Sequence, residues 1–145
     1  MSKGNAFENS LLLLIFNNTN IANVGDATGL RGSSTAGSLY VALHTGDPGE
    51  AGDQTTSECA YTSYARVAVA RSGSGWTVTA ASVSPAANVD FPAATGGSET
   101  ATHFSIGVAT SGASINLYKG TISPNITISN GVQPRLSTAT TVTED

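Results

Sequence analysis

The hydrophobic pattern has a helical period only near the N-terminus, within residues 6–17. The apolar positions at helical spacing are Phe7, Leu11, Leu14 and Ile15. Asn5 stands where an N-cap is needed, and Glu8 follows three residues later, as in a capping box. The pattern therefore predicts a helix over residues 6–17 that is capped by Asn5.

Apolar residues also cover most of the remaining circumference of this helix, at Leu12, Leu13 and Phe16. A helix that is apolar nearly all round needs cover on more than one side. Two interpretations stay open: a neighbouring subunit supplies part of the cover, or the helix is buried on its own sheet. The candidate docking or oligomer contacts are Phe7, Leu11, Leu12, Leu13, Leu14, Ile15 and Phe16.

After the helix, residues 17–37 lack periodicity and predict a loop or extended arm. From residue 39 onward, short apolar–polar alternations are separated by Gly, Pro, Asn or Ser, as in strands and turns. Strands are expected at residues 39–44, 64–71, 76–79, 83–91 (interrupted by Pro85), 101–109, 115–122, 126–128 and 134–142. Residues 72–75 carry a hairpin-turn signature between the second and third of these.

Short strands with regular turn signals, and no helix alternating with them, favour an all-β architecture. We predict a mainly β fold: a β-sandwich or jelly-roll-like single domain with one N-terminal α-helix. Residues 1–37 would form the helix and arm, and residues 38–145 the β-sandwich.

Composition excludes several classes of partner. Charged residues make up 11% of the chain, less than half the usual share of about 25%. The net charge is −4 and the six Lys and Arg residues are scattered singly, so the basic patch of a nucleic-acid-binding protein is missing. The apolar run at residues 11–16 is too short to span a bilayer and lacks the flanks of a signal peptide. The single Cys59 excludes an intramolecular disulfide and a Cys-based zinc site.

Candidate chemistry is sparse. Asp47, Glu50 and Asp53 share a Gly-rich turn, but their order does not match an EF-hand, and we expect solvated acids rather than a metal site. His44 and His103 lie at strand positions without a neighbouring acid that would orient them, and no nucleophile elbow or phosphate-binding loop is present. We therefore expect no enzymatic activity and no cofactor.

An ordered set of motifs resembles a family of small tailed-bacteriophage proteins, often labelled tail-fibre proteins. The matching segments are residues 39–50 (LYVALHTGDPGE), 64–69 (YARVAV), 89–94 (VDFPAA), 102–107 (THFSIG) and 117–120 (LYKG). The resemblance runs from the N-terminal helix to the end of the chain. It implies a virion protein that is assembled in the bacterial host cytoplasm.

Which part of the virion it belongs to is inferred from the chain itself. A fibre shaft usually shows repeats or a heptad stem, and neither is present. We therefore expect a capsid decoration or cement protein that binds the major capsid protein or other virion proteins, as a homo-oligomer and most plausibly a trimer. The alternatives are a tail or tail-fibre component and a carbohydrate-binding module, for which Trp76 and Tyr61 are the candidate aromatics.

Overall fold

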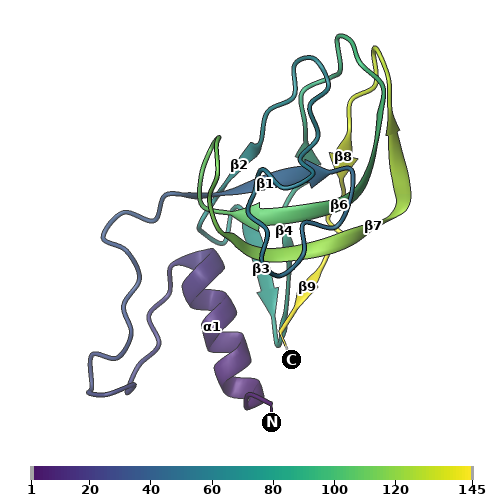
Figure 1. The fold of residues 1–145 in the computed structure, drawn as a ribbon. Coiled ribbons are helices and arrows are strands. Elements are labelled where there is room, and N and C mark those ends of the chain that lie inside the picture. The colour runs from purple at the N-terminus through teal and green to yellow at the C-terminus, as the bar shows by residue number, and fades with distance from the viewer. Residues whose placement is uncertain (1, 145) are drawn as a thin grey trace. The chain divides into compact units, whose positions relative to one another are not determined.

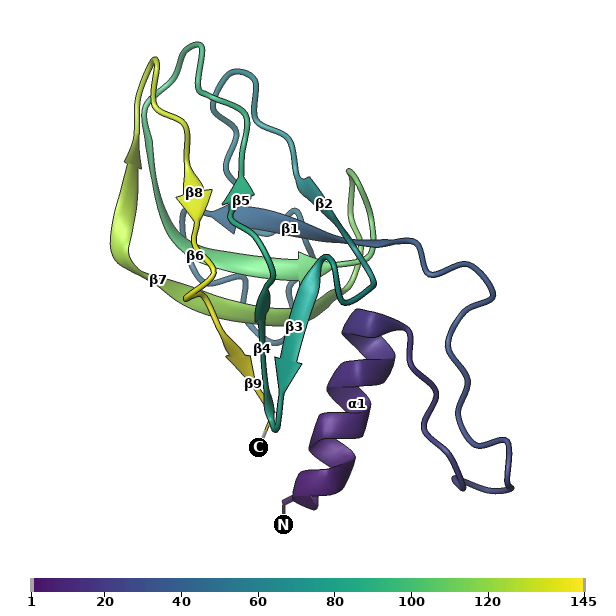
Figure 2. The ribbon, with the colours of Figure 1, turned by 180° about the vertical axis from the view of Figure 1, so that it is seen from behind.

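The computed structural model describes residues 2–144 and shows a mainly β protein with an N-terminal helix (Figures 1 and 2), as the sequence predicts. The helix α1 spans Asn5–Asn17. The strands are β1 (Ser38–His44), β2 (Val67–Ala70), β3 (Trp76–Thr79), β4 (Ser82–Pro85), β5 (Val89–Asp90), β6 (Glu99–Gly107), β7 (Asn116–Ile128), β8 (Arg135–Leu136) and β9 (Val142–Thr143).

The strands form three sheets, with orders β2-β1-β6-β7, β3-β4-β9 and β5-β8. The chain divides into two compact units, each built from separated segments. The first, here called the helical unit, comprises Met1–Ser38, Val69–Asn88 and Ser137–Asp145. The second, here called the β unit, comprises Leu39–Ala68 and Val89–Leu136. The division into a helix and arm over residues 1–37 and a β-sandwich over residues 38–145 stays a prediction.

The start of α1 differs from the sequence prediction. Gly4 is the N-cap, with extended backbone angles and no side-chain cap, and its carbonyl accepts the Glu8 N–H at 3.1 Å. Asn5 is already helical, so its side chain is not at the capping position and the expected capping box does not form. The C-terminal end does carry a recognisable signal: Asn18 adopts a left-handed conformation with φ 57°, and the Thr19 N–H bonds to the Leu13 carbonyl at 3.0 Å.

The expected hairpin at residues 72–75 is wrong. β2 belongs to the four-stranded sheet, whereas β3 pairs with β4 across a turn at Ala80 and Ala81. Residues 72–75 instead form a helical-type turn in which the Ser72 carbonyl accepts both the Gly75 and Trp76 N–H groups at 2.9 Å. The true turn was hidden because Ala80 adopts φ 53°, a conformation that Gly or Asn usually signals.

Three predicted strand boundaries also change. The strands predicted at 115–122 and 126–128 are one strand, β7, which begins at Asn116 and continues through a cis Ser123–Pro124 peptide bond. The predicted strand at 83–91 is two strands, because β4 ends at Pro85 and β5 begins at Val89. The predicted strand at 134–142 is likewise divided, and β8 and β9 pair in different sheets around a turn that begins at Ser137.

The β unit is built around two long antiparallel strands, β6 and β7, which curve side by side in both views (Figures 1 and 2). β1 pairs with the other edge of β6, with Leu43 opposite Phe104 and Val41 opposite Ile106. These four side chains share one face of the sheet and are each no more than 4% exposed, so this face forms part of the core. Register shifts in the β6–β7 pair follow Ala101 and Ile106, and increase its curvature.

Within residues 2–144, no helix is both long enough and apolar enough to cross a membrane.

Candidate functional site

The seven candidate contact residues of α1 lie in different environments. Leu12 and Phe16 are fully buried, and together with Glu8 they face the interior of the helical unit. The Phe16 ring meets the indole of Trp76 edge to face, with centroids 4.8 Å apart. These side chains are therefore engaged in the protein's own core.

A second face of α1 is only partly covered by the rest of the helical unit. Phe7 is 42% exposed. The half-buried members of the candidate set are Leu11, Leu13, Leu14 and Ile15. We call Phe7, Leu11, Leu14 and Ile15 the helix stripe, because their spacing places them along one side of the helix. The helix stripe therefore contains fewer residues than the set of candidate contacts that the sequence indicates.

Arg71 fixes the C-terminal end of the helix, and sequence analysis missed this role. Its Nε donates to the Ile15 carbonyl at 2.7 Å and its Nη2 to the Leu14 carbonyl at 2.8 Å. Its Nη1 donates to the Ala36 carbonyl at 3.1 Å, and so ties down the end of the arm. A cation at this position satisfies terminal carbonyls and opposes the helix dipole. The sequence offered one indirect sign of this role. The last turn of α1 contains no basic residue of its own, so a cation that opposes the helix dipole has to come from another part of the chain.

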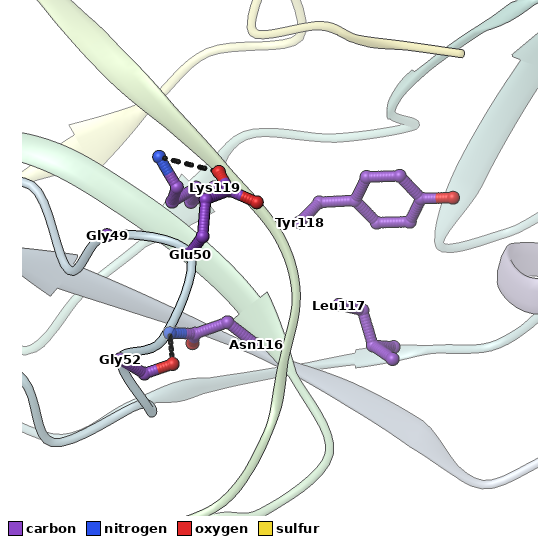
Figure 3. Close-up of a pocket in the computed structure, with 7 residues that line it drawn as sticks. All are labelled: Gly49, Glu50, Gly52, Asn116, Leu117, Tyr118 and Lys119. Carbon is purple, nitrogen blue, oxygen red and sulfur yellow. Dashed lines mark hydrogen bonds and ion pairs between the residues drawn. The ribbon is translucent and has the colours of Figure 1, made fainter. Parts of the chain in front are cut away.

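The acidic turn forms one wall of a surface pocket of about 230 Å³ in the β unit. Its lining residues are Gly49, Glu50, Gly52, Asn116, Leu117, Tyr118 and Lys119. Figure 3 shows Lys119 and Asn116 pointing toward the turn, and Leu117 and Tyr118 pointing away from it. The lining side chains that point toward the turn are therefore polar or charged.

The three acids of this turn do not converge. Lys119 Nζ lies 3.0 Å from an Asp47 oxygen and 3.4 Å from a Glu50 oxygen. A hydrogen bond from the Gly49 N–H, followed by Lys119, lowers the pKa of Asp47. Asp53 instead accepts from Thr55, through its N–H at 2.7 Å and its hydroxyl, which also lowers its pKa. Across residues 2–144, no three His, Cys, Asp or Glu side chains are grouped so that they could hold a metal ion.

His44 has a hydroxyl partner, but both groups are sealed inside the β unit. Its Nε2 lies 2.8 Å from Ser105 Oγ, and its Nδ1 lies 2.8 Å from the Thr56 carbonyl. Because a carbonyl only accepts, Nδ1 carries the proton and the Ser105 hydroxyl donates to Nε2. Burial lowers the pKa of His44, which keeps the ring neutral. Both residues are 0% exposed, so no substrate reaches this pair in the folded structure.

The other candidate residues also have structural surroundings. His103 Nδ1 contacts the Thr102 hydroxyl at 2.9 Å. Burial raises the pKa of the Cys59 thiol to about 12, so the thiol is unreactive at neutral pH. Trp76 and Tyr61 are only 2% and 3% exposed, so neither offers a stacking surface for a sugar.

A buried polar network in the β unit supports the loop between β6 and β7, and the sequence did not reveal it. The Arg66 side chain is 2% exposed and donates to both Glu58 oxygens, from Nε at 2.7 Å and Nη2 at 2.8 Å. The same guanidinium donates to the carbonyls of Ala109 and Gly112, each at 2.9 Å. Gln54, which is fully buried, accepts the Ala109 N–H at 3.1 Å.

We call residues 108–115 the hairpin tip; it is the green loop that joins β6 to β7 in Figure 1. Charge-assisted hydrogen bonds from a buried Arg hold this loop in one conformation. The signal in the sequence was a single Arg66 in an otherwise Ala- and Val-rich run.

Residues 4–143 match the model of a family described as podophage GP4 fiber I protein gp80. The match includes α1 and all nine strands, so it takes in most of both the helical unit and the β unit. No curated protein matches the chain.

Proposed function

The chain belongs to the family described as podophage GP4 fiber I protein gp80, a family of phage virion structural proteins, and we propose that it serves as a fibre component of the particle. The observation that carries this proposal is the match over residues 4–143, which spans nearly the whole chain. The mainly β fold is consistent with a structural role.

We propose that the protein acts by association and not by catalysis, without a cofactor or a metal. Two observations support this. The one close Ser–His pair described above, His44 and Ser105, is buried and serves to hold β1 against β6. The acids of the 47–53 turn pair with Lys119 or with their own backbone, and so are already satisfied.

We further propose that the functional form is a homo-oligomer, with a trimer as the expected form, and that the helix stripe docks against another virion protein. The helix supports this because its one acidic residue, Glu8, is only 7% exposed, so docking would desolvate no exposed charge of α1 itself. Substituting Phe7 and Leu11 by Ser tests the docking face without removing Leu12 and Phe16 from the core.

A capsid decoration protein, docked on the major capsid protein, is the second candidate. The observation that favours it is the absence of repeats or heptads in the sequence, which a fibre shaft would use. Both candidates imply a location in the virion after assembly in the host cytoplasm.

Immunogold labelling of intact particles separates the two candidates. Antibodies raised against the folded chain are applied to wild-type particles and, as a control, to particles that lack the gene. Gold on the fibres supports the proposal, and gold distributed over the faces of the head supports decoration. Absence of gold from wild-type particles whose protein content includes the chain would count against exposure in either location.

A further inference from the structure

Arg31 is the only Lys or Arg side chain of residues 2–144 that the chain itself leaves without a partner. It is exposed, and it forms no hydrogen bond or ion pair within the described residues. The other cations are all engaged with acids or carbonyls of the chain: Lys3 with Glu144, Arg66 with Glu58, Lys119 with Asp47 and Glu50, Arg135 with Asp90, and Arg71 with the carbonyls of Leu14 and Ile15. Arg31 is therefore available to a partner outside its own chain.

The arm at residues 17–37 presents Arg31 on an ordered backbone. Ile21 and Leu30 form a two-way backbone bridge, with N–O distances of 2.9 and 2.8 Å, directly beside Arg31. Leu30 is 43% exposed, so an apolar side chain adjoins the cation. Asp26 is the only acid of the arm; it lies on the other side of the bridge and accepts hydrogen bonds within its own turn. An ordered Arg beside apolar surface is a typical anchor of a protein–protein contact.

The surface pocket beside the acidic turn carries the opposite charge. Each acid of the turn has a partner, but Asp47 and Glu50 share the single ammonium of Lys119, at 3.0 and 3.4 Å. The Glu50 side chain is 96% exposed, so its carboxylate can accept further donors. Asp53 of the same turn is ionised as well, because a hydrogen bond from the Thr55 hydroxyl lowers its pKa. The turn therefore keeps an excess of negative charge.

The same pocket contains an acceptor that the chain does not satisfy. Asn116 points toward the turn in Figure 3, and its Nδ2 donates to the Gly52 carbonyl at 3.4 Å. The side-chain oxygen of Asn116 is buried and receives no hydrogen bond from the described chain. A buried acceptor without a donor costs free energy. A guanidinium carries five N–H donors and a positive charge, and so matches both this oxygen and the Glu50 carboxylate.

We propose that Arg31 of one copy binds in the pocket of the next copy, where its guanidinium pairs with Glu50. This proposal rests on the proposed homo-oligomer and names its contact. The arm of one copy meets the pocket of another, so the contact is heterologous and closes into a ring when the rotation between copies permits, as in the expected trimer. A polyanion is a poorer partner for Arg31, because the net charge is −4 and no second cation stands beside it in the sequence.

Sedimentation equilibrium of the full chain at low salt tests this pairing. Arg31→Glu and Glu50→Arg each turn the attraction into a repulsion, and they change the net charge in opposite directions. The double variant restores the attraction with the two charges exchanged. The matched control is Arg135→Glu, which makes the same charge change as Arg31→Glu at another exposed site. Circular dichroism and thermal unfolding establish that each variant is folded.

We expect an oligomeric wild-type protein, a dissociation constant about tenfold higher for each single variant, and a constant near that of the wild type for the double variant and the control. Folded single variants that keep the wild-type constant, weakening by only one of them, or a double variant as weak as the singles would overturn the pairing and leave the oligomer standing. An equal weakening in the control would also overturn the pairing. A wild type that remains at its monomer mass of 14.6 kDa at micromolar concentration would overturn both proposals.

Discussion

Replacing Arg66 by Met should destabilise the β unit strongly, although the residue lies outside the hydrophobic core. The variant keeps most of the side-chain volume and removes all donors of the guanidinium. Glu58 then loses its two charge-assisted hydrogen bonds and keeps the hydroxyl of Tyr64 at 2.9 Å. The carbonyls of Ala109 and Gly112 lose their Arg66 donor as well.

The magnitude follows from burial. The side chains of Arg66 and Glu58 are 2% and 17% exposed, so water replaces the lost partner poorly. Removing one member of a buried ion pair costs about 3–5 kcal/mol, because the other charge is left without compensation. We therefore expect the free energy of unfolding to fall by that amount. Glu58→Gln in the same background removes the stranded charge, so the double variant should lose less than the sum of the two single losses.

Urea unfolding followed by circular dichroism measures these free energies, provided that the slope of the transition is unchanged. Arg135→Met is the control, because its ion pair with Asp90 is exposed on both sides, with side chains 54% and 40% exposed. This variant should unfold at nearly the wild-type midpoint. A loss below about 1 kcal/mol for Arg66→Met, or additive losses in the double variant, would refute the reasoning that the pair is a buried, coupled support.

Three further predictions concern other sites. Ala80→Gly should raise the free energy of unfolding by about 0.5–1 kcal/mol in the same urea assay, because Ala80 has φ 53° and Gly adopts this conformation without strain; a lower midpoint would contradict this. The pKa of His44 is lowered in the folded protein, so as the pH falls the imidazole binds its second proton at a higher pH in the unfolded chain than in the folded protein. Stability should therefore be fully present above pH about 6.5 and decline as the pH falls toward the lowered pKa, and His44→Gln should flatten that part of the pH profile. Adding a chelator should leave the melting temperature unchanged, and a drop of several degrees that calcium reverses would establish a metal site in the 47–53 turn.

The sequence predicted the fold class well, because its strongest signals are local. The apolar spacing near Phe7 and Leu11 identified the helix, and the alternation at residues 39–44 identified β1 nearly to the residue. Strand pairing was harder. The β3–β4 turn depends on Ala80 in a left-handed conformation, which its residue type does not signal. The continuity of β7 through Pro124 was hidden because Pro usually ends a strand, but β7 is an edge strand and Pro124 lies at a register shift, where Pro is tolerated.

The candidate surfaces were predicted only in part, for a physical reason. Helical periodicity shows which residues share a face, but it does not show which face the rest of the unit covers. Leu12 and Phe16 proved to be the covered residues. The ring of Phe16 packs edge to face on Trp76, and that contact spans 60 positions of sequence. The support of the hairpin tip was hidden for the same reason, since Arg66 reaches carbonyls more than 40 residues away.

The most direct test of the proposed role is a difference map between cryo-electron microscopy reconstructions of wild-type particles and particles that lack this protein. The account predicts that density is lost from the fibres, that the missing volume matches an oligomer of the 14.6 kDa chain, and that the helix stripe faces the neighbouring virion protein. Loss of density spread over the head lattice, with intact fibres, would contradict the fibre assignment and identify the protein as a capsid decoration protein.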